Sequence, residues 1–99
     1  MKISRIFIVE DEQELSETFA DQLNESYVVE TFLNPQEALK KIDAGSTPDL
    51  ILSDIKMPGM SGIAFIEYLK SKKLHIPVVL ISGHTEKSHA IDAIRHGVY

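Results

Sequence analysis

The 99-residue sequence contains no cysteine and no tryptophan, and it has only four prolines and five glycines. The lack of cysteine excludes a disulfide framework and a thiolate zinc site, and nothing indicates an oxidising compartment. The longest apolar runs, such as residues 77–81, are far shorter than the roughly 20 residues that span a bilayer, and the first residues form no signal-peptide pattern. We therefore expect a cytoplasmic protein with no membrane insertion.

Positive charge is scarce in the first part of the chain. Up to Glu37 there are nine acidic residues against two basic ones, and the whole chain carries a net charge of -5. This balance disfavours direct nucleic-acid binding, which requires clustered lysine and arginine. With 43% hydrophobic and 25% charged residues, the composition is that of a soluble globular domain, and 99 residues leave no room for a second one.

Short apolar runs alternate with helix-like segments along the chain. The runs that we interpret as strands are 6–9, 27–32, 50–53 and 78–81. The segments with the periodicity or end signals of helices are 15–23, 35–45, 65–73 and 85–97. Four strand–helix units predict right-handed crossovers and a parallel sheet between two layers of helices, which is the α/β doubly wound class.

Polar residues stand where three of these strands end. Glu10 and Asp11 follow the first strand, Asp54 follows the third, and Ser82 follows the fourth. The carboxyl ends of parallel strands share one edge of the sheet, so we expect these side chains to lie together. Clustered carboxylates repel one another and are stable mainly when a cation compensates them. An oxygen-only set of ligands favours Mg²⁺, which keeps several waters and accepts phosphate oxygens.

Each of these residues also has a purely structural interpretation. Asp11 can be the N-cap of the following helix, beside acids that favour a helix start. Asp54 can cap a local turn, and Ser82 can satisfy backbone groups at a strand end. The combination favours a functional site, because three strand ends supply oxygen ligands while the remaining one, 32–34, supplies none.

Three segments, 8–12, 48–62 and 77–84, resemble the receiver domain of bacterial two-component response regulators. They read Ile-Val-Glu-Asp-Glu, Pro-Asp-Leu-Ile-Leu-Ser-Asp-Ile-Lys-Met-Pro-Gly-Met-Ser-Gly and Pro-Val-Val-Leu-Ile-Ser-Gly-His. The similarity extends from residue 3 to the last residue. It implies a flavodoxin-like fold and a signalling switch rather than an enzyme. It also implies two partners, a sensor histidine kinase that donates a phosphoryl group and an output domain outside this sequence.

The resemblance implies specific roles for the residues at the strand ends. Asp54 would be the phospho-acceptor. The ligands of Mg²⁺ would be Glu10, Asp11, Asp54 and the backbone carbonyl of Lys56. This arrangement agrees with the chemistry of phosphoryl transfer, in which the protein mainly positions groups and neutralises charge.

The same resemblance places further residues around the phosphoryl group. Ser82 and Gly83 would contact it, and Ser82 would move towards it on activation. Lys56 lies two residues after Asp54, and His84 lies two after Ser82. We expect the side chains of Lys56 and His84 to tune the lifetime of the phosphorylated state, because both should overhang the phosphoryl group.

The last part of the sequence departs from the family pattern. Receivers continue with a fifth strand that ends in Lys-Pro and with a fifth helix, which 97–99 do not supply. We therefore expect a single receiver domain over 1–99 that is truncated before these elements. The strand at 78–81 would then be a sheet edge, and apolar surface near Phe19 and Leu23 would be uncovered. From both features we expect self-association.

Two other functions stay open at this point. A magnesium-dependent phosphohydrolase would use an aspartate nucleophile, but the familiar fold of that type needs Asp-x-Asp after the first strand, which 10–13 do not provide. A pseudo-receiver that takes up no phosphate would act by protein contact alone. Turnover of an unrelated phosphate ester would indicate the enzyme, and correct folding without Mg²⁺ binding would indicate the pseudo-receiver.

Overall fold

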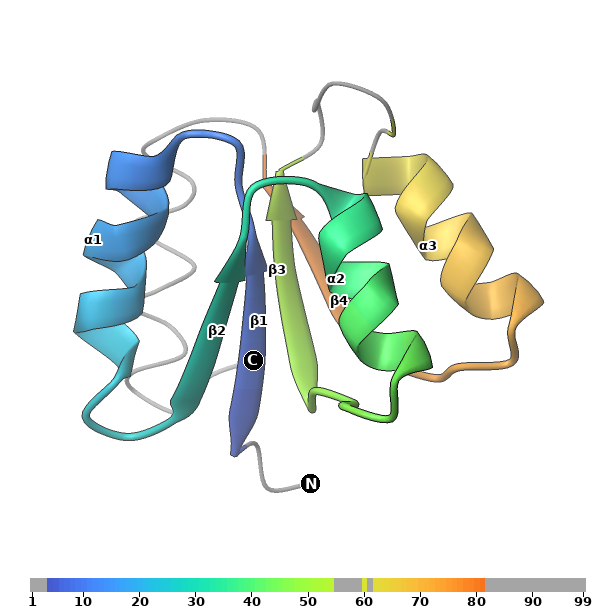
Figure 1. The fold of residues 1–99 in the computed structure, drawn as a ribbon, viewed down its shortest axis with the longest axis horizontal. Helices are drawn as coiled ribbons and strands as arrows, with labels where there is room; N and C mark the ends of the chain where they lie inside the picture. Colours follow the sequence, from blue (N-terminus) through green and yellow to red (C-terminus); the bar gives the residue numbers. More distant parts are fainter. Residues whose placement is uncertain (1–3, 55–59, 61, 82–99) are drawn as a thin grey trace.

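The computed structural model describes residues 4–54, 60 and 62–81, in which strands and helices alternate. In chain order these elements are β1 (Arg5–Val9), α1 (Gln13–Leu23), β2 (Val28–Phe32), α2 (Pro35–Asp43), β3 (Leu50–Asp54), α3 (Gly62–Ser71) and β4 (Val78–Ile81). The strands form one parallel sheet in the order β2-β1-β3-β4 (Figure 1). This topology confirms the predicted doubly wound α/β fold. The helix predicted over 85–97 lies outside the described residues.

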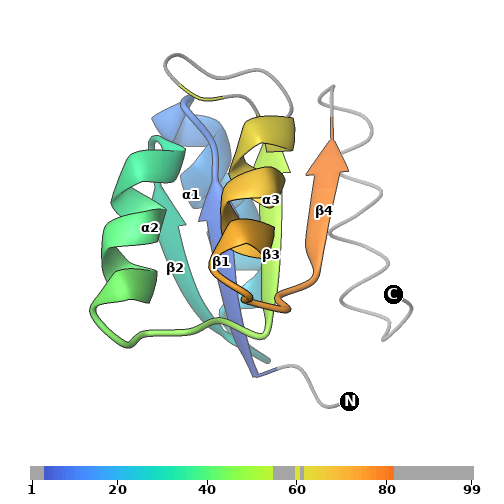
Figure 2. The ribbon, with the colours of Figure 1, turned by 90° about the vertical axis from the view of Figure 1, so that its right-hand side faces the viewer.

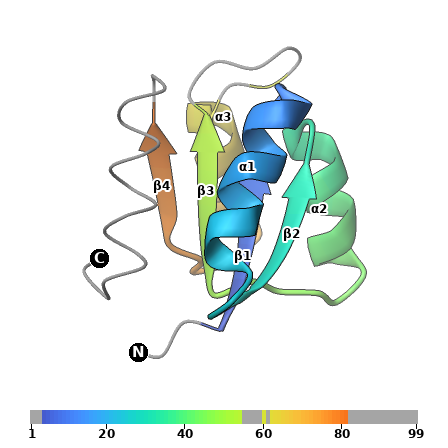
Figure 3. The same ribbon diagram turned by 90° about the vertical axis from the view of Figure 1, so that its left-hand side faces the viewer.

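Helices cover both faces of the sheet. Figure 2 shows α2 and α3 on one face, and Figure 3 shows α1 on the opposite face. The strands supply both cores because neighbouring side chains point to opposite faces. Ile6 and Ile8 of β1 pack in the cluster on the α1 side, whereas Phe7 and Val9 pack in the cluster with α2 and α3. Burial on both faces explains why β1 is an unbroken apolar run.

The structure contradicts the expectation of uncovered apolar surface near Phe19 and Leu23. Phe19 is only 4% exposed and Leu23 only 1%. Both lie on the stripe of α1 that faces the sheet, where they belong to the same cluster as Ile6 and Leu52. Their burial removes one of the two reasons for expecting self-association.

The predicted signals at the start of α2 are confirmed. The side chain of Asn34 accepts a hydrogen bond from the Glu37 N–H at 2.9 Å, and Pro35 is the first helical residue. Proline fits this position because the first N–H groups of a helix have no partner within it. The helix ends at Asp43, two residues before the predicted limit, and Gly45 follows with φ +104°.

The predicted bounds of β4 are confirmed, and those of the other elements differ from the observed ones by one to three residues. β3 includes Asp54, which pairs with Ile81, so this acid is the last residue of the strand rather than the first of a loop. α1 begins at Gln13, before its apolar periodicity starts at Leu15, and α3 begins at Gly62. Among the helices in the described part of the chain, none has the length and apolar character needed to cross a membrane.

Candidate metal centre

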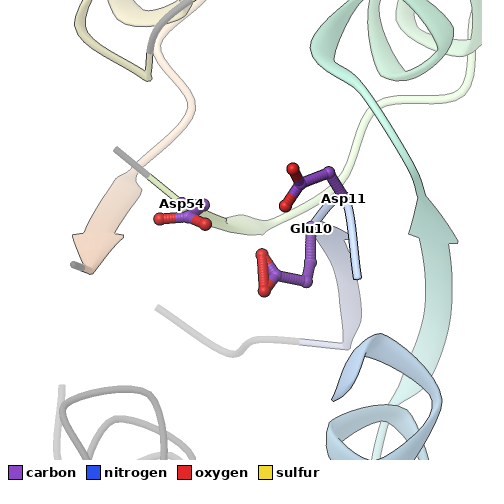
Figure 4. Close-up of side chains that lie close together, drawn as sticks. All are labelled: Glu10, Asp11 and Asp54. Carbon is purple, nitrogen blue, oxygen red and sulfur yellow. The ribbon is translucent and has the colours of Figure 1, made fainter. Parts of the chain in front are cut away.

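Three acidic residues meet at the carboxyl edge of the sheet. β1 and β3 are neighbours in register, with Val9 opposite Ser53, and the next residues along the two strands are Glu10 and Asp54. One carboxylate oxygen from each of Glu10, Asp11 and Asp54 lies within 4.8 Å of the other two. Figure 4 shows the side chains of Glu10 and Asp11 directed towards Asp54. The structure thus brings together the three carboxylates that the sequence placed at strand ends.

The three carboxylates differ in their access to solvent. Glu10 is 3% exposed, Asp54 is half-buried and Asp11 is exposed. The backbone of Glu10 is held because its N–H donates to the carbonyl of Phe32 at 2.9 Å, which extends the β1–β2 ladder past the end of β1. The cluster therefore has a fixed, buried side and an open side through which an ion, water or phosphate can enter.

The structure contradicts the structural interpretation of Asp11 as a helix cap. The N-cap residue of α1 is Glu12, and its side chain makes no capping hydrogen bond. Asp11 precedes the cap, and its carboxylate lies in the acidic cluster instead. Asp11 is therefore not the cap of α1, and its place in the cluster favours the functional interpretation.

The set of carboxylate oxygens fits a small divalent cation. The carboxylate oxygens lie within 4.8 Å of one another, so the three groups repel one another when they are ionised. Bringing a divalent cation among them converts this repulsion into attraction. A hard cation with few protein ligands and several waters is typical of Mg²⁺ sites. Glu10, Asp11 and Asp54 can therefore hold Mg²⁺.

The remaining predicted site residues lie outside the part of the chain that the structure describes. They are Lys56, Ser82, Gly83 and His84. Their proposed roles rest on their positions in the sequence and on the resemblance that these positions carry.

Sequence reasoning missed Ser53, which directly precedes Asp54. Ser53 is 1% exposed, and its hydroxyl donates a hydrogen bond to the backbone carbonyl of Asp54 at 3.0 Å. The signal that could have revealed it is a hydroxyl in an otherwise apolar strand, immediately before a candidate nucleophile.

Comparison with known proteins identifies the family. The family model described as the response regulator receiver domain matches residues 6–99. The chain belongs to this family. Among solved structures, this receiver is similar to the N-terminal domain of a response regulator/sensory box/GGDEF 3-domain protein from Carboxydothermus hydrogenoformans. The two superpose with a TM-score of 0.76 and 35% identity over 88% of this chain and 74% of the other.

Curated relatives of this receiver include transcriptional regulators. The DNA-binding transcriptional regulator NtrC of Escherichia coli strain K12 is 38% identical over 69 residues, or 70% of this chain and 14% of that protein. The regulatory protein AtoC of the same strain is 36% identical over 101 residues, or 98% of this chain and 21% of that protein. The receiver thus corresponds to about a fifth or less of the length of these two relatives. The resemblance inferred from the sequence motifs is confirmed.

Proposed function

We propose that this receiver takes up a phosphoryl group on Asp54 from a phosphohistidine of a sensor histidine kinase in the cytoplasm, and that the reaction depends on Mg²⁺. The phosphorylated and free forms then act as the two states of a switch for an output domain. The observation that carries the proposal is the cluster of Glu10, Asp11 and Asp54, whose carboxylate oxygens lie within 4.8 Å of one another.

Asp54 is the nucleophile in this proposal. It ends β3 and is half-buried, so its carboxylate has a fixed base and an approach from solvent. One carboxylate oxygen forms a bond to phosphorus while the bond from phosphorus to the histidine nitrogen breaks, and the nitrogen leaves with the electron pair. The transition state is loose, so the protein contributes mainly position and charge.

Glu10 and Asp11 serve as ligands for Mg²⁺ together with Asp54 and the backbone carbonyl of Lys56. Bound Mg²⁺ supplies the positive charge that offsets the oxygens of the incoming phosphoryl group. The burial of Glu10 limits its movement, and the exposure of Asp11 leaves room for water ligands. Ser82 and Gly83 contact the phosphoryl group, and Lys56 and His84 set how long it persists.

Labelling with a small phosphodonor tests the proposal. Incubation with acetyl phosphate and Mg²⁺ should add one phosphoryl group, and chelation of Mg²⁺ should prevent it. Asp54→Asn should abolish labelling. Asp21→Asn is the matched control, because it neutralises an exposed acid on α1 away from the cluster. Undiminished labelling of Asp54→Asn would overturn the assignment of the acceptor.

Two further measurements separate the competing functions. Sustained release of phosphate from an unrelated ester, such as p-nitrophenyl phosphate, would indicate a phosphohydrolase instead of a switch. A folded chain that binds no Mg²⁺ and takes up no phosphate would indicate a pseudo-receiver that acts by contact alone.

Self-association is a secondary proposal and rests on β4. Within the described sheet, β4 pairs only with β3, so one row of its backbone groups faces away from that sheet. Pairing of β4 with a second copy would satisfy these groups. Sedimentation velocity should then show a concentration-dependent dimer at micromolar concentration, whereas a monomer over the whole range would contradict the proposal.

A further inference from the structure

A buried hydroxyl lies directly beside the candidate phospho-acceptor. Ser53 is 1% exposed and stands opposite Val9 in the register of β1 with β3. Along β3, Ile51 belongs to the apolar cluster under α2 and α3, whereas Leu52 belongs to the cluster under α1. Because side chains alternate along a strand, Ser53 lies on the same face as Ile51. Its hydroxyl is thus on an apolar face of the sheet.

This hydroxyl bonds to the backbone of the acceptor itself. Ser53 Oγ donates to the carbonyl oxygen of Asp54 at 3.0 Å. The direction of that carbonyl depends on ψ of Asp54, the backbone angle at which the chain leaves β3. The hydrogen bond therefore restrains ψ, and with it the direction of the departing chain relative to the Asp54 carboxylate.

Stability alone does not account for a serine at this position. A hydroxyl that is removed from water loses its hydration, and a hydrogen bond within the protein offsets that loss with only a small net gain. Alanine or valine would fill the apolar face of the sheet without this cost, and valine also favours a strand. A serine on this face departs from the apolar pattern of a buried strand. Where such a departure brings little gain in stability, a functional role is the expected reason.

We propose that Ser53 is a positioning residue for phosphorylation, in which its hydroxyl holds the backbone of Asp54 so that the carboxylate meets the phosphodonor in line. The inference rests on the proposed role of Asp54 as acceptor. Reactions of this kind depend steeply on alignment, and a misplacement of about 1 Å can lower a rate by about 100-fold. Release of a single backbone angle is a smaller disturbance, so loss of the hydroxyl should slow phosphorylation about tenfold.

Two matched pairs of side chains isolate the hydroxyl from the change in volume. The wild type and Ser53→Ala form the small pair, and Ser53→Thr and Ser53→Val form the larger, isosteric pair. We would measure the initial rate of labelling by acetyl phosphate at saturating Mg²⁺, together with the urea midpoint of unfolding. In each pair the member without the hydroxyl should label about tenfold more slowly, while its unfolding midpoint changes little, because a single hydrogen bond contributes only a small net stabilisation.

A large loss of rate with little change in stability distinguishes positioning from simple support of the fold. Equal rates within both pairs, or a rate that falls only together with the unfolding midpoint, would overturn the inference. If the larger side chains impair folding in both Thr and Val variants, the comparison of Ser53→Ala with the wild type still decides, because alanine adds no atoms.

The proposed function and this inference can fail separately. Labelling that persists in Asp54→Asn refutes the acceptor role, and with it the inference. Labelling that requires Asp54 but proceeds at the wild-type rate in Ser53→Ala refutes only the role of Ser53. The backbone ¹³C shifts of Asp54 give an independent readout of ψ. They should differ between Ser53→Ala and the wild type, and unchanged shifts would contradict the restraint.

Discussion

Asp49 and Arg5 are joined by two reciprocal hydrogen bonds at the edge of the sheet opposite to the acidic cluster. The Arg5 N–H donates to Oδ2 of Asp49 at 2.9 Å, and the Asp49 N–H donates to the carbonyl of Arg5 at 2.8 Å. Ser4 donates its N–H to the same carboxylate oxygen at 2.9 Å. This side chain therefore ties the beginning of β1 to the beginning of β3, the two strands that carry the acidic residues at their other ends.

These bonds make the stability of the receiver depend on pH. The hydrogen bonds from Arg5 and Ser4 lower the pKa of Asp49 below its usual 3.8, because both favour the ionised carboxylate. A lowered folded-state pKa means that the stabilisation is present above pH 3.8 and is lost as the pH falls through the folded-state value. The contribution of Asp49 should thus disappear only in acid.

Asp49→Asn tests this linkage. At pH 7 the variant should be less stable by about 1 kcal/mol, because bonds to a charged acceptor are replaced by weaker neutral ones. Below pH 3.8 the difference should shrink. Urea unfolding followed by circular dichroism from neutral to acid pH measures both effects, with Asp43→Asn as a control at an exposed acid. A constant difference across the range would show that Asp49 titrates alike in both states.

The ends of α2 and α3 provide a matched pair for a second prediction. Both helices close with the same two hydrogen bonds. After α2, the N–H of Gly45 donates to the carbonyl of Ile42, and the N–H of Ser46 donates to the carbonyl of Lys41. After α3, the N–H of Lys73 donates to the carbonyl of Lys70, and the N–H of Leu74 donates to the carbonyl of Leu69. This is the Schellman arrangement, which requires a positive φ at the first residue of each pair. Gly45 has φ +104°, whereas Lys73 holds φ 58° with a side chain.

Substitutions at these two positions should change the free energy of unfolding in opposite directions. Lys73→Gly should stabilise the receiver by about 0.5–1 kcal/mol, since it relieves the strain of a left-handed lysine but increases the entropy of the unfolded chain. Gly45→Ala should destabilise it by about 1 kcal/mol for conformational reasons alone, because an added Cβ would meet nothing within 4 Å. Chemical denaturation measures both variants. If Lys73→Gly is the less stable chain, then contacts of the lysine, and not its backbone, dominate.

How far the sequence predicted the site can be traced through individual residues. Glu10, Asp11 and Asp54 follow apolar runs, and parallel strands place such residues at one edge, so their meeting followed from topology. The sequence did not reveal that Asp11 precedes the N-cap of α1. Asp11 and Glu12 are both acids that can cap a helix, and only the backbone angles of the folded chain show that Glu12 is the N-cap. The bond from Ser53 to Asp54 depends on a rotamer within a buried strand, which no spacing in the sequence encodes.

In the core, too, the sequence predicted which residues share one face of a helix but not how deeply the fold buries them. The stripe of α1 was predicted from its spacing, and Phe19 and Leu23 lie on it. The expectation of uncovered apolar surface near them was wrong, because such exposure depends on how closely α1 packs on β1, β2 and β3. That distance is set by side chains from three elements together, and no single segment reveals it.

The lifetime of the phosphorylated state is the subject of a third prediction. Lys56 and His84 each lie two residues beyond a proposed site residue, Asp54 or Ser82. Replacing either with alanine should change the rate of dephosphorylation several-fold by altering the approach of the hydrolytic water. The measurement is the loss of label after removal of the phosphodonor, with unfolding midpoints as a control for the fold. Parental rates in both variants would show that neither side chain overhangs the phosphoryl group.

The acidic cluster leads to a fourth prediction, in which one substitution acts in opposite directions with and without metal. Asp11→Asn removes one of three mutually repelling charges while keeping the size of an exposed side chain. In the presence of a chelator the variant should therefore be more stable than the wild type, by about 1 kcal/mol after allowance for solvent screening. With Mg²⁺ the order should reverse, because the wild type gains stability in proportion to the logarithm of the ratio of Mg²⁺ concentration to Kd. Thermal unfolding over a series of Mg²⁺ concentrations measures the stability without metal, the stability at saturating metal and the concentration at which the order reverses.

Glu14→Gln is the control, since it neutralises an exposed acid in the first turn of α1. Equal gains from Mg²⁺ in Asp11→Asn and the wild type would mean that Asp11 contributes nothing to the metal centre.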